Sequence, residues 1–195
     1  MFTGIIEATG EVLAIETSGS NLDFTIKSGI SNELKIDQSV SHNGVCLTVT
    51  KVLPGAHKVT AVQETLQKTN LGGILVGHQI NLERCMVANG RFDGHIVQGH
   101  VDQTAMCKKI KELDGSWVFE FEYDQTPGNI TVEKGSVTIN GVSLTCFNSQ
   151  DGRFSVTIIP YTMDHTTFNT LKEGDLVNIE FDIIGKYVSK LLNKS

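Results

Sequence analysis

The chain contains an internal repeat, and this repeat limits the possible folds more than any other feature of the sequence. Residues 39–48 align with residues 136–145 at a shift of 97, and seven of the ten aligned positions are identical. The same shift aligns Glu83 with Glu180 further along the chain. Two copies of roughly 90 residues are too long and too few for a solenoid of short repeats, so we expect two similar compact domains.

The repeat also predicts where the domains begin and end. We place the first domain at residues 1–96, the second at residues 97–185, and a separate helix at residues 186–195. Apolar residues recur at helical spacing from Ile183 to Leu192, with lysines between them, which predicts one short amphipathic helix. Such a helix is marginal in isolation, so it must pack on its own barrel or on symmetry mates, and the spacing favours neither.

Each copy is dominated by short stretches in which Val, Ile, Thr and Phe alternate with polar residues, the pattern of half-buried strands. The clearest of these stretches are residues 21–27, 45–53, 118–123 and 154–159. Asn43-Gly44 and Asn140-Gly141 each stand between alternating residues, which is the strongest short-range signal of a hairpin. Because a closed antiparallel barrel leaves no unpaired edge, the sequence predicts an all-β protein with two tandem, similar barrels.

Composition excludes several classes of function. Sixteen Lys and Arg against 22 Asp and Glu give this chain of 195 residues a net charge of -6, with no basic run. Nucleic-acid binding depends on phosphate neutralisation by Lys and Arg, so we expect no nucleic-acid partner. No stretch reaches the roughly 18 apolar residues of a membrane span, and the start of the chain lacks a signal-peptide pattern. We therefore expect no membrane association and a cytoplasmic location.

The strand after the first Asn-Gly turn carries a candidate site. Alternation predicts that Cys46 and Thr48 face the side opposite to Leu47, where small polar side chains suit the rim of a flat heterocycle. A single such strand is more often a solvated face, but this surface is duplicated, with Ser143 in place of Cys46. A thiol and a hydroxyl differ mainly in acidity. Cys46 is thus a candidate proton carrier or nucleophile, and the alternative is a small buried side chain.

A histidine-containing segment, residues 94–102, crosses from the first copy into the second. His95 and His100 are five positions apart and would lie on opposite faces of a strand, so joint metal binding would need a bend. No acidic or cysteine cluster stands beside them, so we expect no metal site and treat them as proton donors or acceptors. Lys134 and Asp182 are of interest because the first copy has a different charge at each matched position. The other four histidines are expected to be surface or structural residues.

Four segments, taken in order, resemble the riboflavin synthase family of the alpha-chain type, whose members carry a duplicated lumazine-binding barrel. They are residues 1–7, 43–49, 94–102 and 140–145. The resemblance implies two six-stranded antiparallel Greek-key barrels, a homotrimer with sites between subunits, and a transferase that needs no cofactor. In the implied reaction two molecules of 6,7-dimethyl-8-ribityllumazine exchange a four-carbon unit, giving riboflavin and 5-amino-6-(ribitylamino)uracil, the last step of riboflavin biosynthesis. A non-catalytic lumazine or flavin carrier of the same family is the alternative.

The same resemblance implies two substrate pockets, one for each copy of the repeat. The first pocket takes Gly4, Ile5, Ile6, Cys46, Leu47, Thr48, Thr60, Ala61, Val62, Gln63, Glu64 and Thr65. The second takes Gly99, His100, Val101, Lys134, Ser143, Leu144, Thr145, Ile159, Pro160, Tyr161, Thr162, Met163 and Asp164. The expected catalytic set is Cys46, His100, Ser143 and Asp182 as proton-handling groups, with Lys134 stabilising charge. Two similar but unequal pockets suit two copies of one substrate that take unlike roles.

Overall fold

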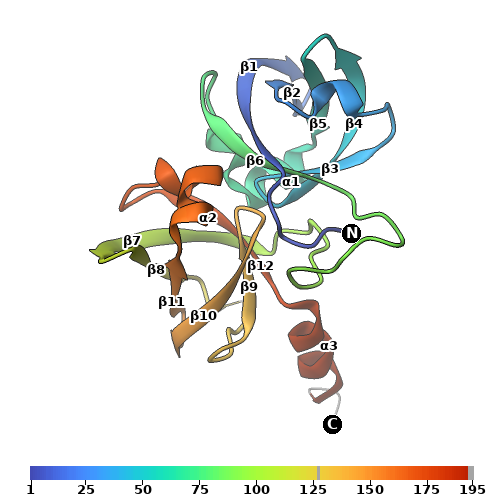
Figure 1. The fold of residues 1–195 in the computed structure, drawn as a ribbon. Helices are drawn as coiled ribbons and strands as arrows, with labels where there is room; N and C mark the ends of the chain where they lie inside the picture. The colour runs from blue at the N-terminus through green and yellow to red at the C-terminus, as the bar shows by residue number, and fades with distance from the viewer. Residues whose placement is uncertain (127, 193–195) are drawn as a thin grey trace.

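A computed structural model describes residues 1–126 and 128–192 of the protein and contains two closed barrels of six antiparallel strands each. Figure 1 shows the first barrel above the second, with the C-terminal helix extending away from the second barrel. The all-β class and the pair of similar six-stranded barrels expected from the sequence are confirmed. Within the described part of the chain, no helix is long and apolar enough to cross a membrane.

The two barrels have the same strand order. The strands of the first barrel are β1 (Ala8–Ser18), β2 (Asn21–Lys27), β3 (Ser39–His42), β4 (Val45–Leu53), β5 (Ala56–Ala61) and β6 (Gln79–Arg84). Those of the second are β7 (Gln103–Leu113), β8 (Ser116–Tyr123), β9 (Ser136–Ile139), β10 (Val142–Gln150), β11 (Arg153–Ile158) and β12 (Leu176–Phe181). Around the first barrel the order is β1-β2-β5-β4-β3-β6, and around the second it is β7-β8-β11-β10-β9-β12. The two copies of the sequence repeat therefore fold into barrels with the same topology.

Short helices follow matched strands and the chain ends in a longer one. The 3-10 helix η1 spans Ser31–Glu33, α1 spans Gln63–Lys68, η2 spans Asn70–Gly73, α2 spans Pro160–His165, η3 spans Thr167–Asn169 and α3 spans Ile183–Leu192. α3 spans the same residues as the helical spacing from Ile183 to Leu192, so it begins before the domain division at residue 186; at its start the Asp182 carboxylate accepts a hydrogen bond from the backbone N–H of Ile184 at 2.9 Å. This contact closes the first turn of the helix. Residues 193–195 of the expected helix lie outside the described residues.

The two Asn-Gly turns form as expected and meet at the junction of the barrels. Asn43 and Gly44 have φ values of 48° and 82°, and Asn140 and Gly141 have φ values of 46° and 82°. A Cβ atom added to Gly44 would lie 2.8 Å from the backbone nitrogen of Gly141. Since no side chain fits in that space, glycine is required there for the close approach of the two turns as well as for the positive φ.

Matched asparagines join the barrels across this junction. The side-chain amide of Asn81 donates to the backbone carbonyl of Asn140 at 2.8 Å, and that of Asn178 donates to the carbonyl of Asn43 at 2.8 Å. Asn81 and Asn178 are 0 % and 1 % exposed, respectively. Because buried amide groups are costly unless they are hydrogen-bonded, these paired contacts fix how one barrel sits on the other.

The interiors of the two barrels differ in chemistry. The second core is rich in aromatic side chains: Phe119, Phe121, Tyr123, Phe154, Phe168 and Phe181. The first core is mainly aliphatic. It also buries His42 and His57, which align with Ile139 and Phe154 of the second barrel. The fold was therefore duplicated, and the two cores then diverged.

Candidate functional site

The segments that precede the first strand of each barrel cross to the opposite barrel. Residues 2–6 and residues 97–101, here called the crossing segments, pair with each other through hydrogen bonds between Phe2 and Val97 of 2.7 and 3.2 Å. The first crossing segment then meets β10, where the backbone N–H of Ser143 donates to the carbonyl of Gly4 at 2.8 Å. In the second, the carbonyl of Gly99 accepts from the backbone N–H of Cys46 at 2.8 Å. Each crossing segment therefore belongs to a site on the other barrel.

This exchange corrects the sequence-based assignment of the two pockets, which placed each crossing segment with its own copy of the repeat. Ile6 packs against the core of the second barrel, and Val101 packs against the core of the first. The expected grouping of residues 4–6 with Cys46, and of residues 99–101 with Ser143, was therefore wrong. The crossing occurs because the pairing between Phe2 and Val97 leads each segment past the junction.

Two surfaces result, which we call cradles. The first cradle is the outer face of β4 at Cys46 and Thr48 together with residues 99–101. The second cradle is the outer face of β10 at Ser143 and Thr145 together with residues 4–6. As the alternation predicts, Cys46 is half-buried and Thr48 exposed, while the intervening Leu47 is buried. The polar rows thus lie outside the barrels, where a flat ligand has access to them.

The thiol of Cys46 lies in the first cradle. Burial raises the pKa of its thiol, and a hydrogen bond with Ser39 opposes that increase only in part. The thiol is therefore protonated at neutral pH and is suited to donating a proton rather than to acting as a thiolate nucleophile. His100 lies in the crossing segment beside it with an exposed side chain. The structure thus brings His100 to Cys46 rather than to Ser143.

Ser143 of the second cradle contacts an imidazole. His95 Nδ1 lies 2.7 Å from the hydroxyl oxygen of Ser143, and its Nε2 lies 3.1 Å from the hydroxyl oxygen of Thr138. Burial lowers the pKa of His95, and the carboxylate of Asp182 opposes this shift. The ring is therefore neutral at neutral pH, and in the tautomer that carries its proton on Nε2 the Nδ1 atom accepts a hydrogen bond from the Ser143 hydroxyl. This pair can accept or return a proton at the cradle surface.

Lys134 and Asp182 lie on the same side of the second barrel. The Lys134 ammonium stands 5.6 Å from the ring centre of Phe147 on β10. Asp182 borders a groove of about 920 Å³ that runs between α3 and the loop before β9, with Ser136 on its opposite wall. The Asp182 carboxylate is near enough to His95 to act on its pKa, so it lies in the neighbourhood of the hydrogen-bonded pair of Ser143 and His95. Of the five expected catalytic residues, Cys46 and His100 thus lie in the first cradle and Ser143 in the second, while Lys134 and Asp182 lie elsewhere on the second barrel.

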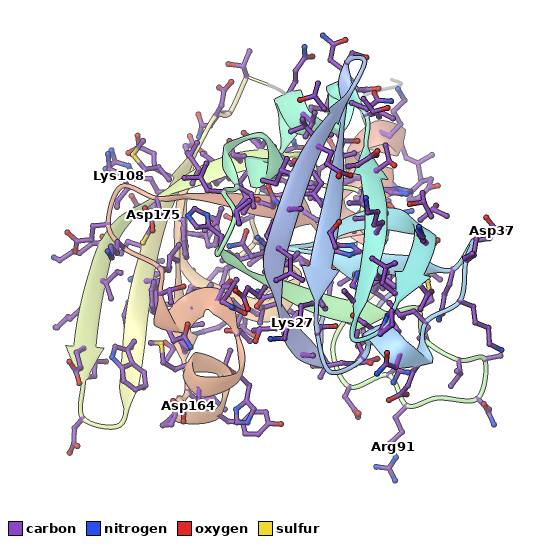
Figure 2. All side chains as sticks on the ribbon, turned by 90° about the horizontal axis from the view of Figure 1, so that it is seen from above. Lys27, Asp37, Arg91, Lys108, Asp164 and Asp175 are labelled. Atoms are coloured by element: carbon purple, nitrogen blue, oxygen red, sulfur yellow. The ribbon has the colours of Figure 1, made fainter. Side chains whose placement is uncertain are left out.

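The remaining expected pocket residues fall into two groups. Leu47 and Ala61 face the first core, so only their backbone is available to a ligand. Leu144 of β10 packs against the second core, and the others occupy strand ends and the short helices α1 and α2; Figure 2 labels Asp164 on α2 at the surface of the molecule. Matched positions on these helices differ: Glu64 forms an ion pair with Lys68 at 2.7 Å, whereas the rings of Tyr161 and His165 stack at 4.1 Å. The two cradles therefore have chemically different rims.

Several residues of the site were not selected from the sequence. Glu83 and Glu180 hold the crossing segments, and Ser39 contacts Cys46. Their signal was present, because the two glutamates are identical in the repeat and stand at the ends of apolar strands, where a carboxylate needs a buried partner. Among residues 1–126 and 128–192, no three or more His, Cys, Asp or Glu side chains gather where they could hold a metal ion.

Comparison with known proteins agrees with this architecture. A family model described as "Lumazine binding domain" matches residues 3–85 and again residues 98–182, one match for each barrel. The chain is 40 % identical over 196 residues to "Riboflavin synthase" of Bacillus subtilis, covering 100 % of this chain and 91 % of the relative. It is 38 % identical over 200 residues to "Riboflavin synthase" of Mycobacterium tuberculosis, covering 100 % of both. The relative of that name from Saccharomyces cerevisiae is 38 % identical over 203 residues, covering 97 % of this chain and 85 % of the relative.

Solved structures show the same fold. A structure of LumP complexed with riboflavin superposes with a TM-score of 0.85 at 21 % identity, over 92 % of this chain and 98 % of that one. LumP complexed with 6,7-dimethyl-8-(1'-D-ribityl) lumazine gives a TM-score of 0.84 at 20 % identity, over 93 % and 99 % of the two chains. At that level of identity the likeness concerns the fold alone. The two family matches and the full-length relatives together show that this chain belongs to the riboflavin synthase family, as a member with two lumazine binding domains.

Proposed function

We propose that this protein is a riboflavin synthase, which converts two molecules of 6,7-dimethyl-8-ribityllumazine into riboflavin and 5-amino-6-(ribitylamino)uracil. One observation carries the proposal: the chain bears two similar cradles that differ at their reactive group, a thiol at Cys46 and a hydroxyl paired with His95 at Ser143. A dismutation needs two sites for one compound and needs those sites to treat it differently. Membership of the family, with full-length relatives of that name, supports the same reaction.

The chemistry begins at the C7 methyl group of one lumazine. Its proton is acidic because the resulting anion is delocalised into the ring and its carbonyl oxygens. Transfer of a four-carbon unit between the two rings then gives both products, so the atoms balance without an oxidant or a reductant. Hydrogen-bond donors aimed at the carbonyl oxygens stabilise the anion, and holding the two rings in register supplies several kcal/mol of the remaining barrier reduction.

The protonation states of the groups in the two cradles suggest that the cradles take different roles in proton transfer. The neutral His95 imidazole accepts the Ser143 proton, which makes this pair suited to removing a proton from a bound ring. The protonated Cys46 thiol is suited to returning one. Lys134 and Asp182 tune the charge beside Ser143, and His100 supplies an exchangeable proton beside Cys46.

The proposal includes a homotrimer in the cytoplasm, with each complete site formed between the first cradle of one subunit and the second cradle of its neighbour. α3 supports this assembly, because its apolar side chains are exposed although such a helix needs a partner. They are Ile184, Tyr187, Val188 and Leu191, each 50 to 68 % exposed. The groove of about 920 Å³ beside α3 offers a second apolar surface in the same region. A second copy of the chain covers both surfaces.

Incubation of the purified chain with 6,7-dimethyl-8-ribityllumazine alone tests the function. We expect riboflavin and 5-amino-6-(ribitylamino)uracil to appear in equal amounts, with two lumazine molecules consumed for each riboflavin formed. Absorbance follows the reaction, and mass spectrometry identifies both products. Tight binding of lumazine without conversion would instead identify a carrier and would contradict the proposal.

A further inference from the structure

Two buried glutamates hold the crossing segments in place. Glu180 on β12 is 2 % exposed, and its carboxylate accepts backbone N–H groups of Gln98, Gly99 and His100 at 2.6, 2.9 and 2.9 Å. The matched residue of the first barrel, Glu83 on β6, is 3 % exposed. Its carboxylate accepts the backbone N–H groups of residues 3 and 4 at 2.6 and 3.0 Å and the residue 3 hydroxyl at 2.8 Å. Burial removes the hydrogen bonds that each carboxylate would make with water, and three donors of the protein take their place.

The opposite side of each crossing segment rests on the other barrel. The Gly99 carbonyl, next to the peptide group held by Glu180, accepts the backbone N–H of Cys46. A Cβ atom on Gly99 would lie 2.6 Å from the Cβ of Cys46, and one on Gly4 would lie 2.5 Å from the Cβ of Ser143. The glycines have the same φ, +79°. The carboxylate therefore holds one side of the segment while its other side is in close contact with Cys46 or Ser143.

We propose that Glu180 and Glu83 are positioning residues for the reaction, each registering a crossing segment on the cradle of the opposite barrel. Glu180 places Gly99 and His100 against Cys46, and Glu83 places Gly4 against Ser143. The part of this inference that concerns catalysis rests on the proposed function; the part that concerns placement does not. Neither glutamate touches the outer face itself, so each acts through the segment that it holds.

The charged groups around the two carboxylates differ, but the backbone contacts are alike. Lys186 of α3 lies near Glu180, and Glu7 lies near Glu83. Substitution by glutamine replaces one acceptor oxygen with an N–H₂ donor that faces backbone N–H groups. The segment must then move, because two donors cannot share that contact. Since the two glutamates serve different cradles, Glu83→Gln is a matched control for Glu180→Gln.

Alkylation of Cys46 tests the placement without any assay of activity. Iodoacetamide is added to folded protein, and alkylation of the peptide that contains Cys46 is followed over time by mass spectrometry. We expect Glu180→Gln to alkylate Cys46 at least roughly tenfold faster than wild type, because the covering segment is released. Glu83→Gln should alkylate Cys46 at the wild-type rate. Both variants should lose roughly 10- to 100-fold in kcat, as expected for a displacement of about 1 Å.

A second variant tests the same claim if Glu180→Gln does not fold. Gly99→Ala pushes the segment away from Cys46 while leaving the carboxylate intact, and Gly4→Ala is its counterpart at Ser143. Of these two glycine variants, we expect Gly99→Ala to alkylate Cys46 faster than wild type and Gly4→Ala to alkylate it at the wild-type rate. Equal alkylation rates in a folded Gly99→Ala or Glu180→Gln variant, its matched control and wild type would overturn it. If wild type itself converts no lumazine, the proposed function fails, and the alkylation result still decides the placement.

Discussion

Replacing Cys46 with alanine is expected to lower kcat by roughly 10²- to 10⁴-fold, the range typical of a lost general acid or base. Binding of riboflavin, the product, should change much less, because the backbone of β4 and the crossing segment remain. The half-buried thiol is protonated at neutral pH, since burial raises its pKa, so its removal deletes a proton source from the first cradle. Steady-state turnover of lumazine and calorimetric binding of riboflavin provide the two measurements.

Cys46→Ser is the matched variant, because the second barrel has serine at this position. The hydroxyl preserves the size and the hydrogen bond to Ser39 but is far less acidic than the thiol. We expect it to recover binding fully and turnover only in part. An equal loss of binding and turnover in both variants would make Cys46 a packing residue and would remove it from the catalytic set.

A second large effect is expected from acid, and it should be larger for the first barrel, which buries a pair of histidines, than for the second, against which His95 alone is buried. His42 and His57 are 0 % exposed, and their Nε2 atoms lie 3.0 Å apart. His42 Nδ1 donates to the carbonyl of Val40 at 3.0 Å, so its Nε2 must accept from His57. His57 Nδ1 then accepts from the hydroxyl of Ser31 at 2.9 Å. All the hydrogen bonds in this series, from Ser31 through the two imidazoles to Val40, form with both rings neutral.

Protonation is opposed by the surroundings of the pair. Burial and the neighbouring ring lower the pKa of His42 from 6.5 to about 3, and burial lowers that of His57 to about 4. The strand partners that face the two rings are apolar: Val45 and Leu82 for His42, and Ile26 and Val52 for His57. In the described part of the chain, no carboxylate is among the groups that set either value.

These depressed pKa values give the direction of the pH dependence. Above pH 6.5 both histidines are neutral in the folded and in the unfolded protein, and the pair contributes its full stability. As the pH falls from about 6.5 towards 4, the unfolded chain binds protons that the folded barrel does not, so stability is lost. At pH 5 the loss for two histidines is about 4 kcal/mol, or roughly a thousandfold in the unfolding equilibrium. Glu83 and Glu180 have raised pKa values in both barrels, so they do not produce a difference between them.

Urea unfolding at pH 8 and pH 5 measures this effect. Trp117 on β8 is the single tryptophan, so its fluorescence reports the second barrel, and hydrogen exchange with peptide mass spectrometry reports the first. We expect the first barrel to lose more stability than the second between pH 8 and pH 5, because two buried histidines lie in the first and only His95 contacts the second. The double variant His42→Ile with His57→Phe, which carries the residues of the second barrel, should lose the extra pH dependence. An unaltered pH dependence in that variant would exclude the histidine pair as its cause.

The sequence was sufficient for the fold because the repeat and the strand alternation are local signals. The stretch 21–27 and the stretch 45–53 match β2 and β4 residue for residue, and both Asn-Gly turns form. The helical spacing from Ile183 to Leu192 also matches α3, and the side-chain contact of Asp182 with its first turn is a detail that the spacing does not show. Local pattern thus determined the elements.

The candidate functional site was harder to predict from the sequence than the fold was. Alignment of the two copies shows which residues are equivalent, but it does not show which barrel each residue lies against. The crossing of Gly4 to Ser143 and of Gly99 to Cys46 depends on tertiary pairing and was missed for that reason. His42 and His57 were grouped with surface or structural residues. They proved to be structural, and their complete burial follows from strand register across the first barrel.

The central claim is that each chain carries two unequal binding surfaces, each completed by a segment from the other barrel. Calorimetric titration with a lumazine analogue that lacks the C7 methyl group, and therefore cannot react, tests it most directly. The account predicts two binding events per chain with different affinities, one altered by Gly99→Ala and the other by Gly4→Ala. A single event per chain at saturation, or two events altered equally by both substitutions, would contradict it.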